Sequence, residues 1–122
     1  MTETRIHDRV GYRVKLWCYH YYTADGEIVR FEEPIMMEVF DVSLGGIGII
    51  TKTEFPQGAT LEFTFYLEQI PYQVLTQVKW LNTNNVFCRY GLEIIGHNNM
   101  LFRHLQQFVK GHSILDDQKR TI

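Results

Sequence analysis

The sequence has little cysteine and no long apolar run. Its only two cysteines, Cys18 and Cys88, lie far apart and show no CxxC spacing. This pattern excludes a disulfide framework and the common zinc sites, so we expect two reduced, buried thiols. No segment approaches the roughly 20 apolar residues of a membrane helix, and the N-terminal stretch MTETRIHDR lacks the apolar part of a signal peptide. We therefore expect a cytoplasmic protein without membrane insertion.

The sequence also lacks a strong net charge. It holds 12 basic and 14 acidic residues, which gives a formal net charge of −2. A general binder of nucleic acid polymers would carry a strongly basic domain, so we expect no such partner. The charges are nevertheless segregated, because Arg5, Arg9, Arg13 and Lys15 precede an acidic block at 27–41. A local positive cluster on an acidic protein indicates a small anionic ligand.

The common signatures of catalysis and metal binding are missing as well. Ser43 does not lie in a GxSxG turn, and no histidine pair has HExxH spacing. His97 and His104 are more consistent with surface or hydrogen-bonded positions than with a metal site. We expect no catalytic residue, no metal and no cofactor. One alternative stays open, a small enzyme that uses Asp41 and Ser43. Turnover of a nucleotide or ester that is abolished in Asp41→Ala would support it.

The sequence is rich in the residues of β-strands. Aromatic residues make up 14% of the chain, and the stretch from 10 to 22 alternates apolar with polar side chains before the turn residues Asp25 and Gly26. Further apolar runs lie at 28–31, 36–42, 47–51, 60–67, 72–81 and 86–95. The short breaks between these runs predict six or seven antiparallel strands in one domain, arranged as a barrel or a sandwich.

The period changes near the end of the chain. Asn98 and Asn99 are suitable N-caps, and apolar residues then recur at helical spacing until Gly111. We predict an amphipathic helix over 98–111, which either plugs the barrel or binds a partner, followed by a loose tail over 113–122.

Two motifs carry the chemistry. In RIHDR, Arg5 and Arg9 share one face of the chain and offer guanidinium forks that suit phosphate oxygens or the O6/N7 edge of guanine. In DVSLGG, Asp41 and Ser43 share one face of a strand end, and an acceptor-only carboxylate suits the N1/N2 donors of guanine.

Each motif also has a plain structural interpretation. The arginines could be solvated side chains near a terminus, and the DVSLGG stretch could be a capped turn in which Gly45 and Gly46 supply unusual backbone angles. Two further residues are possible secondary ligand contacts: Trp80 could stack on a purine or pack in the core, and Arg89 could reach a phosphate or stay solvated.

Taken together, RxxxR followed by DxSxxG on a small β-barrel resembles the PilZ family of cyclic di-GMP receptors. The strand around Trp80, the stretch RYGLEII and the helix after it extend the resemblance over nearly the whole chain. Arg13 completes a second RxxxR match, RVGYR, but falls inside the alternation of the first strand. The family often carries a further arginine beside the first of the pair, whereas here Ile6, His7 and Asp8 fill the gap, and Asp8 reduces the local positive potential.

The resemblance implies a mainly β fold, a six-stranded antiparallel PilZ-like barrel with one C-terminal helix. It implies a PilZ-like domain over 1–112, in which a flexible segment at 1–10 clamps cyclic di-GMP. Arg5 and Arg9 would hold the ligand, Asp41 and Ser43 would hold a base edge, and Gly45 and Gly46 would make room.

The same resemblance implies a receptor that signals to an unidentified protein in the control of motility, exopolysaccharide or biofilm. The alternative is a degenerate PilZ-like adaptor that acts by protein contacts without nucleotide binding.

Overall fold

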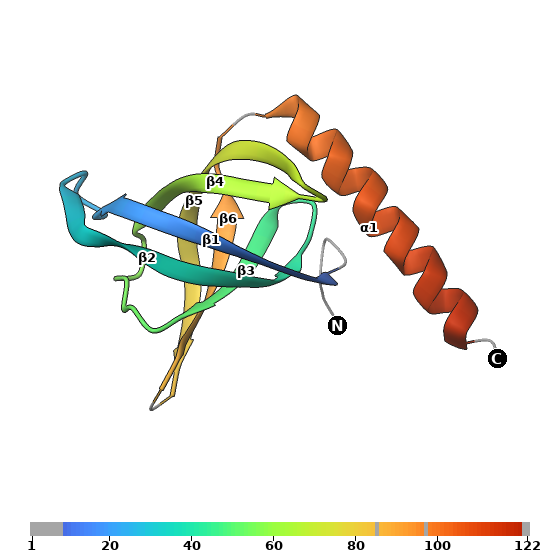
Figure 1. Ribbon diagram of the computed structural model, residues 1–122, viewed down its shortest axis with the longest axis horizontal. Coiled ribbons are helices and arrows are strands. Elements are labelled where there is room, and N and C mark those ends of the chain that lie inside the picture. Colours follow the sequence, from blue (N-terminus) through green and yellow to red (C-terminus); the bar gives the residue numbers. More distant parts are fainter. Residues whose placement is uncertain (1–8, 85, 97, 121–122) are drawn as a thin grey trace, which may run out of the picture.

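The computed structural model describes residues 9–84, 86–96 and 98–120, with side chains described up to residue 112. Six antiparallel strands close into a barrel in the order β1-β2-β3-β6-β5-β4, and one long helix follows them (Figure 1). The elements are β1 (Val10–Tyr22), β2 (Ile28–Val42), β3 (Gly46–Thr51), β4 (Thr60–Leu67), β5 (Ile70–Thr83), β6 (Cys88–Ile94) and α1 (Asn99–Arg120). The prediction of a six-stranded antiparallel barrel with one C-terminal helix is confirmed.

Side chains alternate along the strands between the barrel interior and its outer surface. In β4, four apolar side chains are buried, and each residue between them is at least partly exposed. The interior is closely filled by large apolar side chains, among them Leu16, Met37, Ile47, Ile49, Phe65 and Tyr90. A small barrel of this kind leaves no room inside for a ligand. A binding site must therefore lie on the outer face or at an end.

The second strand differs from its prediction. Separate strands at 28–31 and 36–42 were expected because Pro34 lies between them, whereas β2 is one continuous strand. Near the proline, the register of β1 against β2 shifts between Cys18 and His20 of β1. Proline has no N–H to donate, so it is tolerated where a ladder is irregular. The two expected segments are one bulged strand, which leaves six strands in all.

The helix extends beyond its predicted end. Asn98 caps it as expected, because its Oδ1 accepts a hydrogen bond of 3.0 Å from the backbone N–H of Leu101. The predicted stop at Gly111 is wrong: α1 continues to Arg120, through most of the tail that was expected to be loose at 113–122. Gly111 does not adopt the positive φ of a C-cap glycine. A glycine with helical angles only weakens a helix, and Leu115, Gln118, Lys119 and Arg120 after it are good helix formers.

The buried face of α1 packs against one end of the barrel. Phe108 contacts the ring of Tyr12 at a centroid distance of 5.1 Å. His104 binds the hydroxyl of Tyr72 through Nδ1 at 2.7 Å and the carboxylate of Glu68 through Nε2 at 2.9 Å. The helix is therefore joined to the barrel by both apolar packing and hydrogen bonds.

Candidate functional site

A flat platform lies on the outer face of the barrel. Asp41, Gly48, Gly91 and Trp80 stand side by side across β2, β3, β6 and β5, because each is the direct cross-strand partner of the next. The two glycines carry no side chain, and their neighbours fill the space above them. A Cβ on Gly48 would overlap Asp41 and the ring of Phe40, and a Cβ on Gly91 would overlap the indole of Trp80. We call Phe40, Asp41, Gly48, Trp80 and Gly91 together the platform.

Two β-bulges turn the platform side chains outward. The β2–β3 register passes from Val39 to Asp41 and leaves Phe40 as an extra residue. The buried side chains of Val39 and Val42 therefore enclose two consecutive outward-facing residues. A second shift in β5 leaves Lys79 as an extra residue immediately before Trp80. Bulges of this kind re-aim side chains next to functional sites.

The first and second sequence motifs meet at one edge of the platform. Arg9 Nη2 donates to Asp41 Oδ1 at 2.7 Å, and Arg9 Nε donates to Asp41 Oδ2 at 3.0 Å. The side chains are 27% and 21% exposed. This bidentate geometry is the strongest form of an arginine–carboxylate pair, and partial burial reduces its screening by water. Arg5 lies outside the described residues.

The rest of the DVSLGG stretch forms the turn from β2 to β3. The backbone N–H of Ser43 donates to the carbonyl of Gly46 at 2.9 Å, and the Ser43 side chain is buried. Gly45 accepts a hydrogen bond of 3.0 Å from Ile94 of β6. A Cβ on Gly46 would stand 3.0 Å from the carbonyl oxygen of Leu92. The turn is closed by these backbone hydrogen bonds. The capped-turn interpretation is wrong about the glycines, because the only described glycines with a positive φ are Gly26 and Gly58; Gly46 instead gives room to β6.

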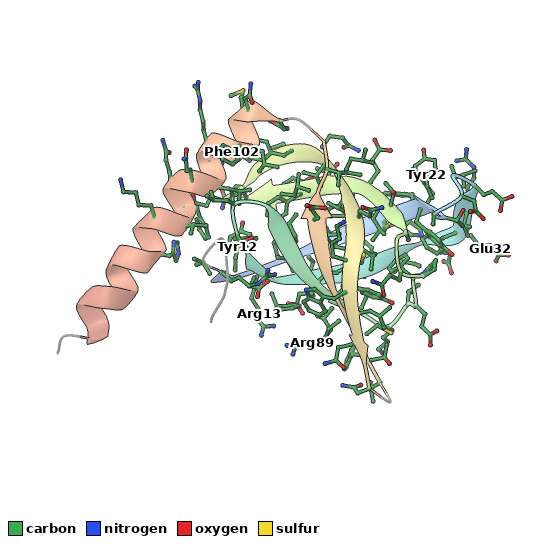
Figure 2. All side chains as sticks on the ribbon, turned by 180° about the vertical axis from the view of Figure 1, so that it is seen from behind. Tyr12, Arg13, Tyr22, Glu32, Arg89 and Phe102 are labelled. Carbon is green, nitrogen blue, oxygen red and sulfur yellow. The ribbon has the colours of Figure 1, made fainter. Side chains whose placement is uncertain are left out.

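Of the two secondary candidates, Trp80 belongs to the platform and Arg89 lies beside it. Trp80 is 43% exposed, so core packing does not apply to it. Arg89 points away from the barrel (Figure 2), with its Cζ 4.7 Å from the centre of the Phe40 ring. Arg13, the rival for the second arginine of the first motif, lies within β1 and stands 3.8 Å from Glu38.

Sequence reasoning missed Phe40, Gly48 and Gly91. The signal for Phe40 was present, since the two residues between the apolar Val39 and Val42 break the strand alternation. The glycines carried no such signal, because their importance arises only from the pairing of β3 with β6.

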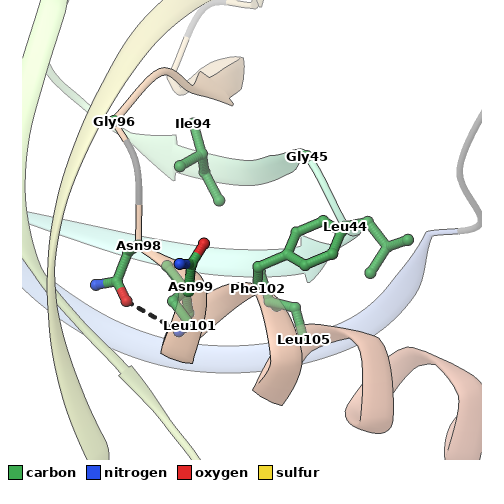
Figure 3. Close-up of a pocket in the computed structure, with 9 residues that line it drawn as sticks. All are labelled: Leu44, Gly45, Ile94, Gly96, Asn98, Asn99, Leu101, Phe102 and Leu105. Carbon is green, nitrogen blue, oxygen red and sulfur yellow. Dashed lines mark hydrogen bonds between the residues drawn. The ribbon is translucent and has the colours of Figure 1, made fainter.

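A hollow of about 370 Å³ lies beyond the motif turn, between the barrel and the first turns of α1 (Figure 3). Its walls are mostly apolar, and they include Leu44 and Gly45 of the motif turn together with Phe102 and Leu105 of α1. The turn that follows the platform acid is therefore in direct proximity to the helix.

The other reactive groups are two cysteines. Cys18 and Cys88 are buried and free, as expected, and burial raises the pKa of the Cys18 thiol. Within the described ranges, no three His, Cys, Asp or Glu side chains are grouped to hold a metal ion. No helix in the described part of the chain is long and apolar enough to cross a membrane.

Fold and site together define a class: a small closed β-barrel whose outer face carries an acid, an arginine paired with it and aromatic side chains beside it. A family model described as PilZ domain matches residues 3–111. The chain therefore belongs to the PilZ domain family. No curated protein sequence matches it at a significant level.

Solved PilZ structures share the fold. YcgR from Escherichia coli in complex with c-di-GMP has a TM-score of 0.64 and 17% identity over 96% of this chain. The isolated PilZ domain of YcgR with c-di-GMP has a TM-score of 0.62 and 16% identity, and 97% of its chain is covered. The Bacillus subtilis inhibitor of motility, MotI/DgrA, has a TM-score of 0.69 and 16% identity over 93% of this chain, and 53% of its own length is covered. The present chain spans 49% of the full YcgR structure.

Proposed function

We propose that this domain is a receptor for cyclic di-GMP. Arg5 and Arg9 hold the ligand, Asp41 and Ser43 hold a guanine edge, and Trp80 offers a stacking surface. The observation that carries this proposal is the contact of Arg9 with Asp41, which places the two signature motifs of the chain at one edge of the platform. Further support comes from the family match and from the two YcgR structures, whose crystals hold c-di-GMP.

The chemistry of the platform suits a guanine nucleotide. Asp41 can only accept hydrogen bonds, and guanine presents two adjacent donors at N1 and N2. The indole of Trp80 covers Gly91 and is 43% exposed, so it can offer a π-face to a planar base. A guanidinium fork matches the oxygens of a phosphate. The platform therefore offers complementary groups to the base and to the phosphodiester of one ligand.

Binding on this scheme is an exchange of partners. In the structure the donors of Arg9 occupy both oxygens of Asp41. The nucleotide supplies N–H donors to the carboxylate and anionic oxygens to the arginine, so that neither charge is left unpaired. An exchange of this kind avoids the large cost of isolating a partly buried charge.

The output of the domain is a changed surface presented to a separate protein. Ordering of residues 1–10 against the platform would add the nucleotide and both arginines to one face of the barrel. Proteins of motility, exopolysaccharide production or biofilm control are the proposed partners, and the setting is the cytoplasm. We propose no catalytic step and no cofactor.

Isothermal titration of cyclic di-GMP tests the proposal, with GTP, cyclic GMP and cyclic di-AMP as competitors of related chemistry. We expect selective binding at micromolar or lower concentration that is lost in Asp41→Ala and kept in Glu38→Ala, a matched acidic residue on the same strand. The titration also gives the stoichiometry, one cyclic molecule or an intercalated pair. No heat at high concentration would favour the adaptor that works without nucleotide.

A further inference from the structure

The guanidinium of Arg89 lies over the ring of Phe40. Arg89 lies on β6 and is exposed, and its guanidinium stands 4.7 Å from the centre of the Phe40 ring. Among the described residues no carboxylate pairs with it, whereas Arg9 and Arg13 each contact an acid. Stacking on an aromatic ring fixes the plane of a guanidinium while its edge N–H groups stay available. Arg89 is therefore oriented, and its fork is free for a ligand.

The Phe40 ring brings this fork to the platform. Phe40 is the extra residue of the β2 bulge, and its Cζ and Cε2 atoms lie 2.8 and 2.9 Å from where a Cβ on Gly48 would stand. The ring thus lies over the same glycine as the carboxylate of Asp41. Arg89 reaches the ring from β6, while Arg9 reaches the carboxylate from the start of β1. The platform acid lies between two arginines that come from opposite directions.

We propose that Arg89, presented by Phe40, reads the O6/N7 edge of the guanine whose N1/N2 edge is held by Asp41. This inference rests on the proposed function and adds a specificity residue to it. An arginine fork donates to both O6 and N7 of guanine, whereas adenine places an amino donor at the corresponding position and repels the fork. A base that lies between Asp41 and Arg89 would meet a carboxylate at its donor edge and a guanidinium at its acceptor edge. The pair therefore selects guanine from both sides.

The first test compares cyclic di-GMP affinities by isothermal titration. We expect Arg89→Ala to raise Kd about tenfold or more, in keeping with the loss of one bidentate base contact. Arg89→Lys keeps the charge but loses the fork, so it should recover only a small part of the affinity. Arg13→Ala is the matched control, an exposed arginine on the neighbouring face, and should change Kd less than twofold. Equal effects of Arg89→Ala and Arg13→Ala would mean that only general charge is sensed.

The second test asks whether Arg89 contacts N7 of the guanine base. An analogue of cyclic di-GMP with CH in place of guanine N7 removes one acceptor of the proposed contact. It should bind the native protein several-fold more weakly than cyclic di-GMP does, and Arg89→Ala should no longer distinguish the two ligands. If the two losses simply multiply, Arg89 does not contact N7, and the inference is overturned.

The third test concerns the aromatic support. Phe40→Leu keeps an apolar side chain at the bulge but removes the ring under Arg89. We expect it to raise Kd about threefold in the native background and to have no effect in Arg89→Ala. Independent effects in the two backgrounds would contradict the support role. Thermal unfolding of each variant shows whether the barrel is intact, and a native protein that binds no cyclic di-GMP refutes the proposed function rather than this addition to it.

Discussion

The pair of Arg9 and Asp41 gives the sharpest prediction, because it contributes in opposite ways to stability and to binding. An exposed ion pair contributes roughly 0.2 to 1 kcal/mol, and removal of one partner of a fully buried pair costs roughly 3 to 5 kcal/mol. With bidentate geometry and side chains that are 27% and 21% exposed, this pair lies between those limits. We expect a coupling energy of about 1 to 2 kcal/mol in the ligand-free protein. Since a ligand must open the pair, that energy weakens its affinity about fivefold to thirtyfold.

Urea unfolding of the native protein, Arg9→Ala, Asp41→Ala and the double variant measures the coupling directly. The same cycle on Arg13 and Glu38, which are 3.8 Å apart at a more exposed position, serves as the control and should give less than about 0.5 kcal/mol. High salt should reduce the Arg9–Asp41 coupling only in part, because the pair is partly buried. A coupling below about 0.3 kcal/mol would show that the two side chains are not paired in solution, and the exchange of partners on binding would have to be abandoned.

Three further predictions concern the site and the core. Arg9→Ala should weaken cyclic di-GMP binding by about 2 to 5 kcal/mol in isothermal titration, and an unchanged affinity would remove Arg9 from the site. Gly91→Ala should lower the free energy of unfolding by about 1 to 3 kcal/mol and shift the Trp80 fluorescence, because the new Cβ displaces the indole. Burial raises the pKa of the Tyr90 hydroxyl to about 12, above the value near 10 in an unfolded chain, so the folded state retains the proton longer. The contribution of Tyr90 to the free energy of unfolding is therefore constant below about pH 10 and is lost between about pH 10 and pH 12. This fall in the free energy of unfolding should persist in Tyr19→Phe and be smaller in Tyr90→Phe.

Much of the fold could be predicted because apolar residues recur with a different period in strands and in helices. The alternation in β1 and β4 follows the burial of their side chains closely. The prediction was wrong where one residue was given too much weight: Pro34 does not divide β2, and Gly111 does not end α1. Proline and glycine disfavour regular structure locally, but packing along the whole element decides the outcome.

The site was less accessible to sequence reasoning. That Arg9 and Asp41 belong to one site was expected only from a family resemblance, since the two residues are far apart in the chain, and their direct contact was not predicted. Gly48 and Gly91 become neighbours through the register of β3 with β6, which local sequence does not encode. The contact of Arg89 with Phe40 depends in addition on a bulge. Such features follow from non-local pairing and appear only once the barrel is closed.

The closed barrel separates what must be kept from what can change. On β3, Ile47 and Ile49 fill the interior, whereas Gly48 between them belongs to the outer platform. The strands under the platform likewise carry interior and outer residues, apart from the bulges at Phe40 and Lys79, so the outer residues can change while those that fill the interior are kept. The architecture is therefore highly evolvable: descendants of one ancestral chain could change their nucleotide preference, or give up the ligand and keep a protein-binding face, without redesigning the core that folds them.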